Sequence, residues 1–364
     1  MKYIVPEYYQ YFQCKCSNCR SSCCDGWPIR ITRKEYFRLL GVTCSEQLRS
    51  RLDIALKVSP QPSNECYGLI TTNWKGLCTL HREDGLCALQ SELGESSLPE
   101  VCKRYPRNTR HNVEHNECSC SNSCEKVVEL LLEQQQPLQF LEMELLLEPE
   151  FLTALNPIKY SSCQRSISLL QRRSLSLPER FLTLGNYLYG FQSSKDKPAS
   201  LSEAFQLLLT MNQYYKRSRS ISEYCQISQH YYGAPDEETL SSLQLAVLAQ
   251  KHQLACSILE HTLPSWQVTL EQLLVNHMFY NNFPSTDKWE NVCDIFLSLV
   301  CVYSFIKFTL LGNLQENTTK DMLTDIISAL FRVIDHSGFQ SVAISISKEK
   351  NLTNDTIIAQ LVYI

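Results

Sequence analysis

The chain has 364 residues, 18 of them cysteine, and a formal net charge of −4. This length allows one large domain or two ordinary ones, and the charge argues against nucleic acid as the main partner. The opening residues contain no apolar segment of the length that a secretory signal needs. The longest apolar run, residues 295–306, is too short to span a bilayer and is typical of a buried helix. We therefore expect a cytoplasmic protein without a membrane segment.

The cysteines are concentrated at the start of the chain. Thirteen of the 18 lie within the first 124 residues. A secreted disulfide scaffold is usually a small domain behind a signal sequence, and neither condition holds here. In a reducing cytosol, clustered thiols are more often metal ligands or redox groups. The five later cysteines are well separated along the chain, and we expect them to be buried small apolar side chains.

The first segment with a clear pattern is residues 12–27, FQCKCSNCRSSCCDGW. It holds five cysteines within eleven positions: Cys14, Cys16, Cys19, Cys23 and Cys24. Residues 1–13, rich in tyrosine, are expected to pack over this cysteine loop. Residues 29–57 are predicted to be helical, with a first helix that ends before Gly41 and a second that begins at Ser45.

A second group of cysteines follows, from Cys78 to Cys124. Asp84-Gly85 is a tight-turn signal between two short segments, and a hairpin there brings Cys78 and Cys87 together. Pro99 can begin a helical turn that carries Cys102, Arg104 and Tyr105. The group ends with Cys118, Cys120 and Cys124.

From residue 125 onward the pattern is helical. Ser176–Glu179 and Ser200–Glu203 both have capping-box spacing. Apolar runs with roughly helical spacing occupy 201–211, 240–257, 270–280, 292–311 and 322–333. The alternating VAISIS at 342–347 predicts a short strand. The fold class is therefore mainly α, with an N-terminal cysteine-rich metal-cluster domain (1–135) followed by an α-helical domain (136–364).

The cysteines indicate a soft metal. Thiolate ligands select zinc, copper(I) or iron–sulfur clusters over magnesium and calcium. A zinc ribbon normally shows two CxxC pairs, and only Cys16 and Cys19 form one. The spacing of the cysteines along the sequence is compatible with both a structural zinc site and a functional iron–sulfur centre. The chain has no GxGxxG, P-loop, GxSxG or HExxH motif, and no CxxxCxxC of the kind used by standard radical S-adenosylmethionine enzymes.

Several of these blocks together resemble the flagellin lysine-N-methylase family. They are MKYIVPEYYQYF, FQCKCSNCRSSCCDGW, GLCTLHREDGLCALQSELGESSLPEVCKRYPR and SCEK, with LLVNHMFYNNFP further on. The resemblance is close over residues 1–135 and looser beyond. It implies a methyltransferase that uses S-adenosylmethionine to methylate the ε-amine of surface lysines of flagellin. It also implies an iron–sulfur cluster, expected to be 4Fe–4S, held by cysteines of the N-terminal part.

The resemblance also implies a set of metal ligands. The family's cysteines fall on Cys14, Cys19, Cys23, Cys24, Cys78, Cys87, Cys102 and Cys124. Cys16, Cys118 and Cys120 are additional to the family pattern. Eight cysteines are too many for one four-ligand cluster, so there are two metal sites or some of the eight are structural.

The implied chemistry needs a deprotonated amine. A lysine ammonium is not a nucleophile at neutral pH, so the site must desolvate it or supply a base. Our candidate catalytic residues are Asp25 and Tyr105. Trp27 and Arg104 are the candidate cofactor contacts, since an aromatic wall can hold a methylsulfonium or an ammonium. Packing of the cysteine loop is the alternative role for the aromatic rings.

Two other classes of function are compatible with the sequence. One is a non-enzymatic protein-binding module acting on flagellin, in which zinc or iron only stabilises the fold. The other is an electron-transfer protein. The absence of a glycine-rich cofactor loop favours these alternatives, and the resemblance favours the enzyme.

Overall fold

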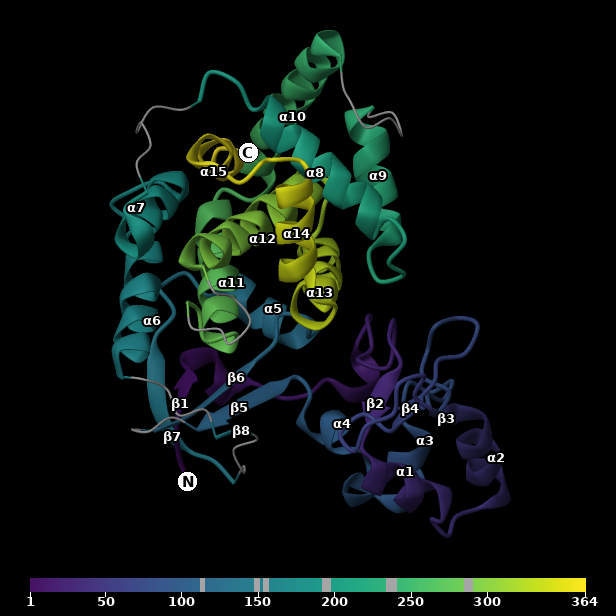
Figure 1. Cartoon of the computed structure of the whole chain (residues 1–364). Helices are drawn as coiled ribbons and strands as arrows, with labels where there is room; N and C mark the ends of the chain where they lie inside the picture. The colour runs from purple at the N-terminus through teal and green to yellow at the C-terminus, as the bar shows by residue number, and fades with distance from the viewer. Residues whose placement is uncertain (112–114, 147–150, 153–156, 192–197, 234–240, 285–290) are drawn as a thin grey trace. The chain divides into compact units, whose positions relative to one another are not determined.

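The computed structural model describes the chain except for residues 112–114, 147–150, 153–156, 192–197, 234–240 and 285–290 (Figure 1). The chain divides into two compact units. The helical unit consists of Met1–Phe12 and Asn108–Ile364, and the cysteine unit of Gln13–Arg107. The cysteine unit is thus an insertion in the helical unit, with its ends at residues 13 and 107, whereas the sequence predicted one division at residue 135.

The helical unit begins in a sheet. Among the described residues its strands are β1 (Lys2–Pro6), β5 (Arg107–His111), β6 (Asn116–Cys120), β7 (Phe140–Glu144) and β8 (Phe151–Leu152). The order is β7-β1-β6-β5-β8. β1 runs parallel to β6 and antiparallel to β7, so that Tyr3 lies opposite Asn116 on one side and Met143 on the other.

The N-terminal segment belongs to the core of the helical unit. Tyr3 and Val5 alternate with exposed or half-buried residues and are fully buried in the core of the helical unit. A short 3-10 helix, Glu7–Tyr11, follows β1 and buries Tyr8 and Tyr9. The residues that were expected to cover the cysteine loop thus include a strand of the helical unit, and their alternation is that of a strand paired on both edges.

Helices make up most of the helical unit, which confirms the mainly α prediction. They are α5 (Glu125–Glu133), α6 (Pro157–Leu170), α7 (Leu177–Tyr189), α8 (Ser202–Tyr215), α9 (Ser222–Tyr232), α10 (Ser242–Thr262), α11 (Trp266–Tyr280), α12 (Val292–Asn313), α13 (Lys320–His336), α14 (Phe339–Glu349) and α15 (Asp355–Val362).

The centre of the helical unit is α12 (Figure 1). Every residue from Ile295 to Asn313 is buried, and α7, α9, α14 and α15 pack around the helix. By length and composition α12 is apolar enough to cross a membrane, but its apolar window is completely enclosed by the unit. It is a core helix, as predicted for residues 295–306. At Gly312 the absence of a side chain lets α9 approach closely, since a Cβ there would lie 2.6 Å from Ser228 Oγ.

Of the two capping boxes predicted in this unit, only the first forms. The capping box of Ser176 and Glu179 forms at the start of α7. The one predicted at Ser200 does not form, because α8 begins at Ser202 and the side chain of Gln360 accepts from the amides of Glu203 and Ala204 (3.1 and 3.2 Å).

The short strand predicted at 342–347 is wrong. These residues belong to α14, whose buried side chains include Phe339, Ala343 and Ile346. The spacing of these three residues places them on one helical face that packs toward α12. The alternation of VAISIS therefore reflects only the order of small and apolar residues within a helix.

The cysteine unit combines short helices with a small antiparallel sheet. Its elements are β2 (Ile29–Ile31), α1 (Arg33–Leu40), α2 (Glu46–Ala55), β3 (Leu56–Val58), β4 (Gly68–Ile70), α3 (Ala88–Leu93) and α4 (Glu100–Arg104), with 3-10 helices at Cys16–Asn18 and Glu95–Ser97. The strand order is β2-β4-β3. The two predicted helices are present, ending at Gly41 and capped by Ser45, but residues 29–31 form a strand.

Candidate functional site

Four cysteines of the cysteine unit come together: Cys23, Cys78, Cys87 and Cys102. Each of these thiols interacts electrostatically with the other three. They come from separate parts of the unit, namely the N-terminal loop, the segment after β4, the N-cap of α3 and the body of α4. The sequence alone did not distinguish these four from the other predicted ligands.

Backbone hydrogen bonds bring these segments together. The amide of Cys78 donates to the carbonyl of Cys24 (2.7 Å), which ties the N-terminal loop to the chain after β4. The predicted hairpin then returns the chain, with the amide of Arg82 donating to Leu86 O (2.8 Å) around Gly85, whose φ is +82°. His81 and Cys87 face each other across this hairpin. The predicted approach of Cys78 to Cys87 is confirmed.

The surroundings of Cys78, Cys87 and Cys102 raise the pKa of these thiols and favour the protonated form. Burial raises the pKa of Cys78 to about 11, and the neighbouring Cys87 and Cys23 add to the increase. Burial is also the main cause of the raised pKa of Cys102, and the neighbouring Cys78, Cys87 and Cys23 raise it further. The ionised forms thus repel one another in a low-dielectric site. A bound cation would reverse this balance by pairing with the thiolates and displacing their protons.

The donor set fits a soft metal centre. Four thiols are the usual ligand set of structural zinc and of 4Fe–4S clusters. Within the part of the chain that the structure describes, no three histidine, cysteine or carboxylate side chains are already gathered closely enough to hold a single metal ion.

The other predicted ligands have different surroundings. Cys14 and Cys19 lie in the N-terminal loop, Cys14 exposed and Cys19 half-buried, and the amide of Cys16 contacts Cys14 Sγ at 3.4 Å. Cys24 packs against the apolar core of the cysteine unit. Cys124 belongs to the helical unit, where it is the N-cap residue of α5.

Cys118 and Cys120 are core residues of the helical unit. Both are fully buried in β6, within the core of the helical unit. The main chain of Cys120 exchanges hydrogen bonds with the Tyr8 hydroxyl (3.1 and 3.3 Å). These two cysteines pack as small apolar side chains in a strand, which accounts for their place outside the family pattern.

The candidate catalytic and cofactor residues are partly brought together. The rings of Trp27 and Tyr105 have centroids 6.2 Å apart at an angle of 57°. Arg104 pairs with Glu100 at 3.3 Å on α4. Asp25 is half-buried, and its backbone forms an isolated bridge with Leu77 immediately before Cys78. Asp25 and Trp27 lie within four residues of Cys23 in the sequence, and Arg104 and Tyr105 within three residues of Cys102.

The helical unit contains a buried polar network that the sequence did not reveal. His277 Nδ1 lies 2.9 Å from Asp335 Oδ1, and Ser121 Oγ donates to Asp335 Oδ2 at 2.5 Å. The side chain of Asp335 is completely buried. Burial alone would raise the pKa of Asp335, but the hydrogen bond and charge of His277, the charge of His336 and the Ser121 hydroxyl outweigh it and lower that pKa. His277 lies in the block LLVNHMFYNNFP, so this part of the resemblance concerns a structural network.

We expect Asp335→Asn to lower the free energy of unfolding by about 3 kcal/mol near neutral pH, because it leaves buried donors without their carboxylate. A carboxyl group with a lowered pKa stabilises the fold above its unfolded-state value near 4, and this contribution is lost as pH falls below that value. The difference between variant and wild type should therefore shrink on going from pH 6 to pH 3. Urea unfolding at several pH values measures this difference in the free energy of unfolding.

The matched control is Glu133→Gln, which breaks an exposed pair with Lys320 (2.9 Å) in the same unit. An exposed pair contributes at most about 1 kcal/mol. Equal stability of Asp335→Asn and wild type at neutral pH would contradict the role given to this carboxylate.

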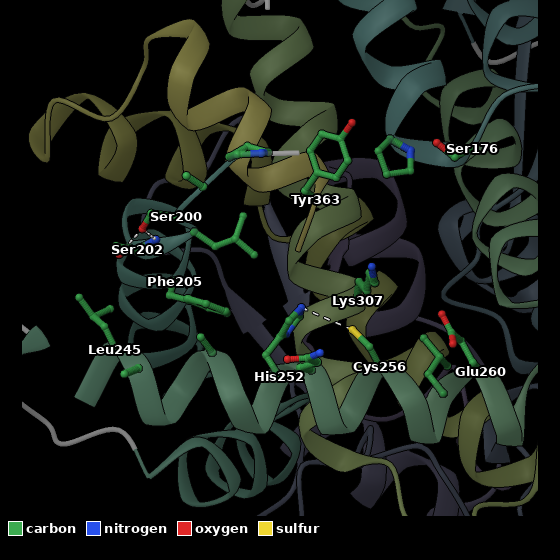
Figure 2. Close-up of a pocket in the computed structure, with 18 of the residues that line it drawn as sticks. Ser176, Ser200, Ser202, Phe205, Leu245, His252, Cys256, Glu260, Lys307 and Tyr363 are labelled. Atoms are coloured by element: carbon green, nitrogen blue, oxygen red, sulfur yellow. Dashed lines mark hydrogen bonds between the residues drawn. The ribbon is translucent and has the colours of Figure 1, made fainter. Parts of the chain in front are cut away.

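A pocket of about 780 Å³ lies beside α10 in the helical unit (Figure 2). We call it the α10 pocket, and its lining includes Ser200, Phe205, His252, Cys256, Glu260 and Lys307. Figure 2 shows His252, Cys256 and Glu260 rising from one face of α10 into the pocket, with Lys307 of α12 facing them. Cys256 Sγ lies 3.5 Å from His252 Nε2, as expected of residues four apart on a helix.

Lys307 is an unusual lining residue, because it is a cation in the core helix and only 6% exposed. Its ammonium lies 4.4 Å from the centroid of the Trp266 ring and donates to the main-chain oxygen of Ile364. These contacts hold the charge at the wall of the pocket. The sequence gave no reason to single out Lys307 within the apolar run 292–311.

The fold and the site thus define a mainly helical protein with an inserted unit that gathers four thiols. A family model described as "FliB lysine N-methylase C-terminal domain" matches residues 164–361, more than half of the chain. This range includes most of the lining of the α10 pocket. The chain belongs to the FliB lysine N-methylase family.

Curated relatives agree with this membership. A lysine-N-methylase of Salmonella choleraesuis and one of Salmonella typhimurium are each 22% identical to the chain, with 92% of both chains covered. A flagellar biosynthetic protein FliU of Salmonella muenchen is 29% identical over 133 residues, which cover 35% of this chain and 75% of that protein. No solved structure matches the chain.

Proposed function

We propose that this protein transfers a methyl group from S-adenosylmethionine to lysine side chains of flagellin. The observation that carries the proposal is membership of the FliB lysine N-methylase family over most of the helical unit. The names of the full-length relatives support methylation of protein lysine, and the flagellar name of the partial relative supports a flagellar substrate.

We further propose that the enzyme depends on an iron–sulfur cluster held by Cys23, Cys78, Cys87 and Cys102. The mutual approach of these thiols supports a soft four-sulfur centre. Four thiolates can hold a 4Fe–4S cluster or a single zinc ion, and the resemblance of residues 1–135 to flagellin lysine-N-methylases favours the cluster. Such a cluster supplies a Lewis-acidic or redox-active metal and cross-links the unit.

Residues beside the thiol group can prepare the substrate amine. The proposal gives Asp25 the role of accepting the lysine proton and the paired rings of Trp27 and Tyr105 the role of an apolar wall for the amine. The rings would attract the cationic amine by a cation–π interaction, and transfer of its proton to Asp25 would release the nucleophilic form. We place this chemistry in the cytoplasm, where the cysteines stay reduced; all 18 are free thiols in the structure.

Mass spectrometry of flagellin tests the function. Protein purified without oxygen and incubated with flagellin and S-adenosylmethionine is expected to add methyl groups to lysine residues, and reactions without S-adenosylmethionine should add none. The zinc-stapled binding module predicts binding to flagellin with no added methyl group. Metal-loaded protein that leaves flagellin unmodified would therefore rule out the enzyme.

A further inference from the structure

We propose that an exposed basic face of the cysteine unit docks a carboxylate-rich segment of the substrate polypeptide. This basic face consists of Arg30 of β2, Lys57 of β3, Leu69 of β4 between them, and Arg33 at the start of α1. The inference rests on the proposed function and names the chemistry by which the polypeptide is recognised. It places substrate docking in the same compact unit as the proposed amine site at Asp25.

The two units of the chain differ in charge. The cysteine unit has 14 lysine and arginine residues against 10 aspartate and glutamate residues, whereas the whole chain has 34 against 38. The cysteine unit therefore has a formal charge of +4 and the helical unit one of −8. Such an asymmetry attracts an acidic partner to the basic unit and repels it from the other.

The register of the small sheet places two cations in one row. Arg30 and Lys57 lie opposite Leu69 on its two sides, in the antiparallel order β2-β4-β3. Opposite residues share a face of the sheet, and two strand spacings separate the Cα atoms of the two cations by about 10 Å. The alternate residues Ile31 and Ile70 are buried, whereas Arg30 and Lys57 are exposed. The row therefore lies on the outer face of the sheet.

Arg33 adds a third cation three residues after Arg30. Its guanidinium carbon lies 6.0 Å from the centroid of the Phe37 ring and 5.7 Å from that of the Tyr67 ring. Stacking on the rings orients the guanidinium and leaves its N–H groups available for a carboxylate. Among the residues that the structure describes, no carboxylate forms an ion pair with Arg30, Arg33 or Lys57. An arriving carboxylate can accept charge-assisted hydrogen bonds from these cations without displacing an internal partner.

The charge of the basic face excludes the target lysine as its occupant, because three cations repel an ammonium. The lysine belongs at Asp25, and the acidic residues of the same segment belong on the face. Arg30 follows Asp25 by five residues, so their Cα atoms are at most about 18 Å apart. A substrate segment of about six extended residues spans this distance. We therefore expect acidic residues within about six positions of each methylated lysine.

A polypeptide fits the basic face better than a nucleic acid does. Sites on nucleic acid commonly neutralise about six to ten phosphates along an extended basic surface. Three cations within a short row suit one or two carboxylates. The half-buried Leu69 between the cations also offers an apolar contact to a neighbouring side chain.

The test compares flagellin binding by two charge-reversed variants, measured by interferometry without S-adenosylmethionine so that no reaction is needed. We expect Arg30→Glu with Lys57→Glu to weaken binding about tenfold or more at low salt, and the difference should shrink at high salt. The KM for flagellin should rise by a larger factor than kcat falls. The matched control, Arg165→Glu with Arg172→Glu, reverses two exposed arginines of the helical unit and changes the net charge equally. It should bind as wild type does.

A pair of synthetic peptides tests the chemistry of the occupant. Both contain one lysine, and the positions within six residues of it carry glutamate in one peptide and glutamine in the other. Wild type should bind the glutamate peptide more tightly, and Arg30→Glu with Lys57→Glu should lose this preference. If that variant fails to fold, Arg33→Gln decides the question, with binding of flagellin weakened about threefold or more.

The outcomes separate this inference from the proposed function. Wild-type affinity in the variant of Arg30 and Lys57, while wild type methylates flagellin, overturns the docking face and leaves the function standing. An equal loss in the control variant would also overturn it, since net charge alone would then explain binding. Flagellin that binds through the face but gains no methyl group would support the docking and refute the activity. Tighter binding of wild type to duplex DNA or phosphatidylserine vesicles than to flagellin, lost in the variant, would overturn the polypeptide as occupant.

Discussion

The Cys23→Ser variant is expected to purify without iron or sulfide and to lose flagellin methylation. Cys23 is exposed, so the exchange of sulfur for oxygen should disturb the fold little while it removes one of four thiolates. The remaining three thiols lie in a low-dielectric site where burial raises the pKa of Cys78 to about 11. Without the fourth ligand, a metal must still displace these tightly held protons, and its binding energy falls accordingly. Metal analysis and the visible absorbance of the anaerobically purified protein measure the loss.

The matched control is Cys66→Ser in the same unit. Cys66 is half-buried, and its sulfur lies 4.0 Å from the Ser59 hydroxyl, outside the thiol group. This variant should keep the wild-type metal content and activity. Wild-type iron in Cys23→Ser would refute the assignment of this ligand. Full activity in Cys23→Ser without iron would leave the metal a purely structural role. Parallel serine variants of Cys14, Cys19, Cys24 and Cys124 test whether a second centre exists.

The second large effect is expected from Glu271→Gln, which should lower the free energy of unfolding by about 3–5 kcal/mol. The Glu271 carboxylate is completely buried in α11. It accepts from Arg180 Nη1 at 2.6 Å and from Arg173 Nη2 at 2.9 Å. An amide of the same shape keeps the packing but leaves two guanidinium groups without an anion. Since Arg180 is also buried, its charge cannot be solvated in place.

Chemical denaturation at neutral pH measures this change, with Glu133→Gln as the exposed control. The carboxylate joins α7, α11 and the turn after α6, so its loss should also loosen the packing of α7. Protection of the amides of α7 from hydrogen exchange is therefore expected to fall more than that of α12. An unchanged unfolding midpoint in Glu271→Gln would show that the ion pair contributes nothing net.

Local sequence signals predicted much of the fold but not the selection of the site. Gly41, Ser45, Ser176 and the turn at Gly85 acted as predicted, because capping and turn geometry depend on neighbouring residues. The strand at residues 2–6 was not predicted, since a strand of five residues depends on its partners β6 and β7, more than 100 residues away.

The residues of the candidate site show the same contrast between local signals, which are predictable, and long-range contacts, which are not. The approach of Cys78 to Cys87 follows from a hairpin and was predictable, whereas the addition of Cys23 and Cys102 depends on tertiary packing. Lys307 is as buried as the apolar residues around it, and its contacts with Trp266 and Ile364 come from distant parts of the sequence. Such long-range partners leave no periodic pattern in the sequence.

Because the cysteine unit is inserted after Phe12, it is synthesised between β1 and the partner strand of β1. β1 leaves the ribosome first, yet its parallel partner β6 begins only at Asn116. At about 5–20 residues per second, β1 waits roughly 5–20 s for that partner. The cysteine unit is complete within this interval and can fold and acquire metal while the nascent sheet is still open. Factors that deliver iron and sulfide, or chaperones that shield the unpaired β1, would therefore act on the chain before the ribosome has made α11 and α12.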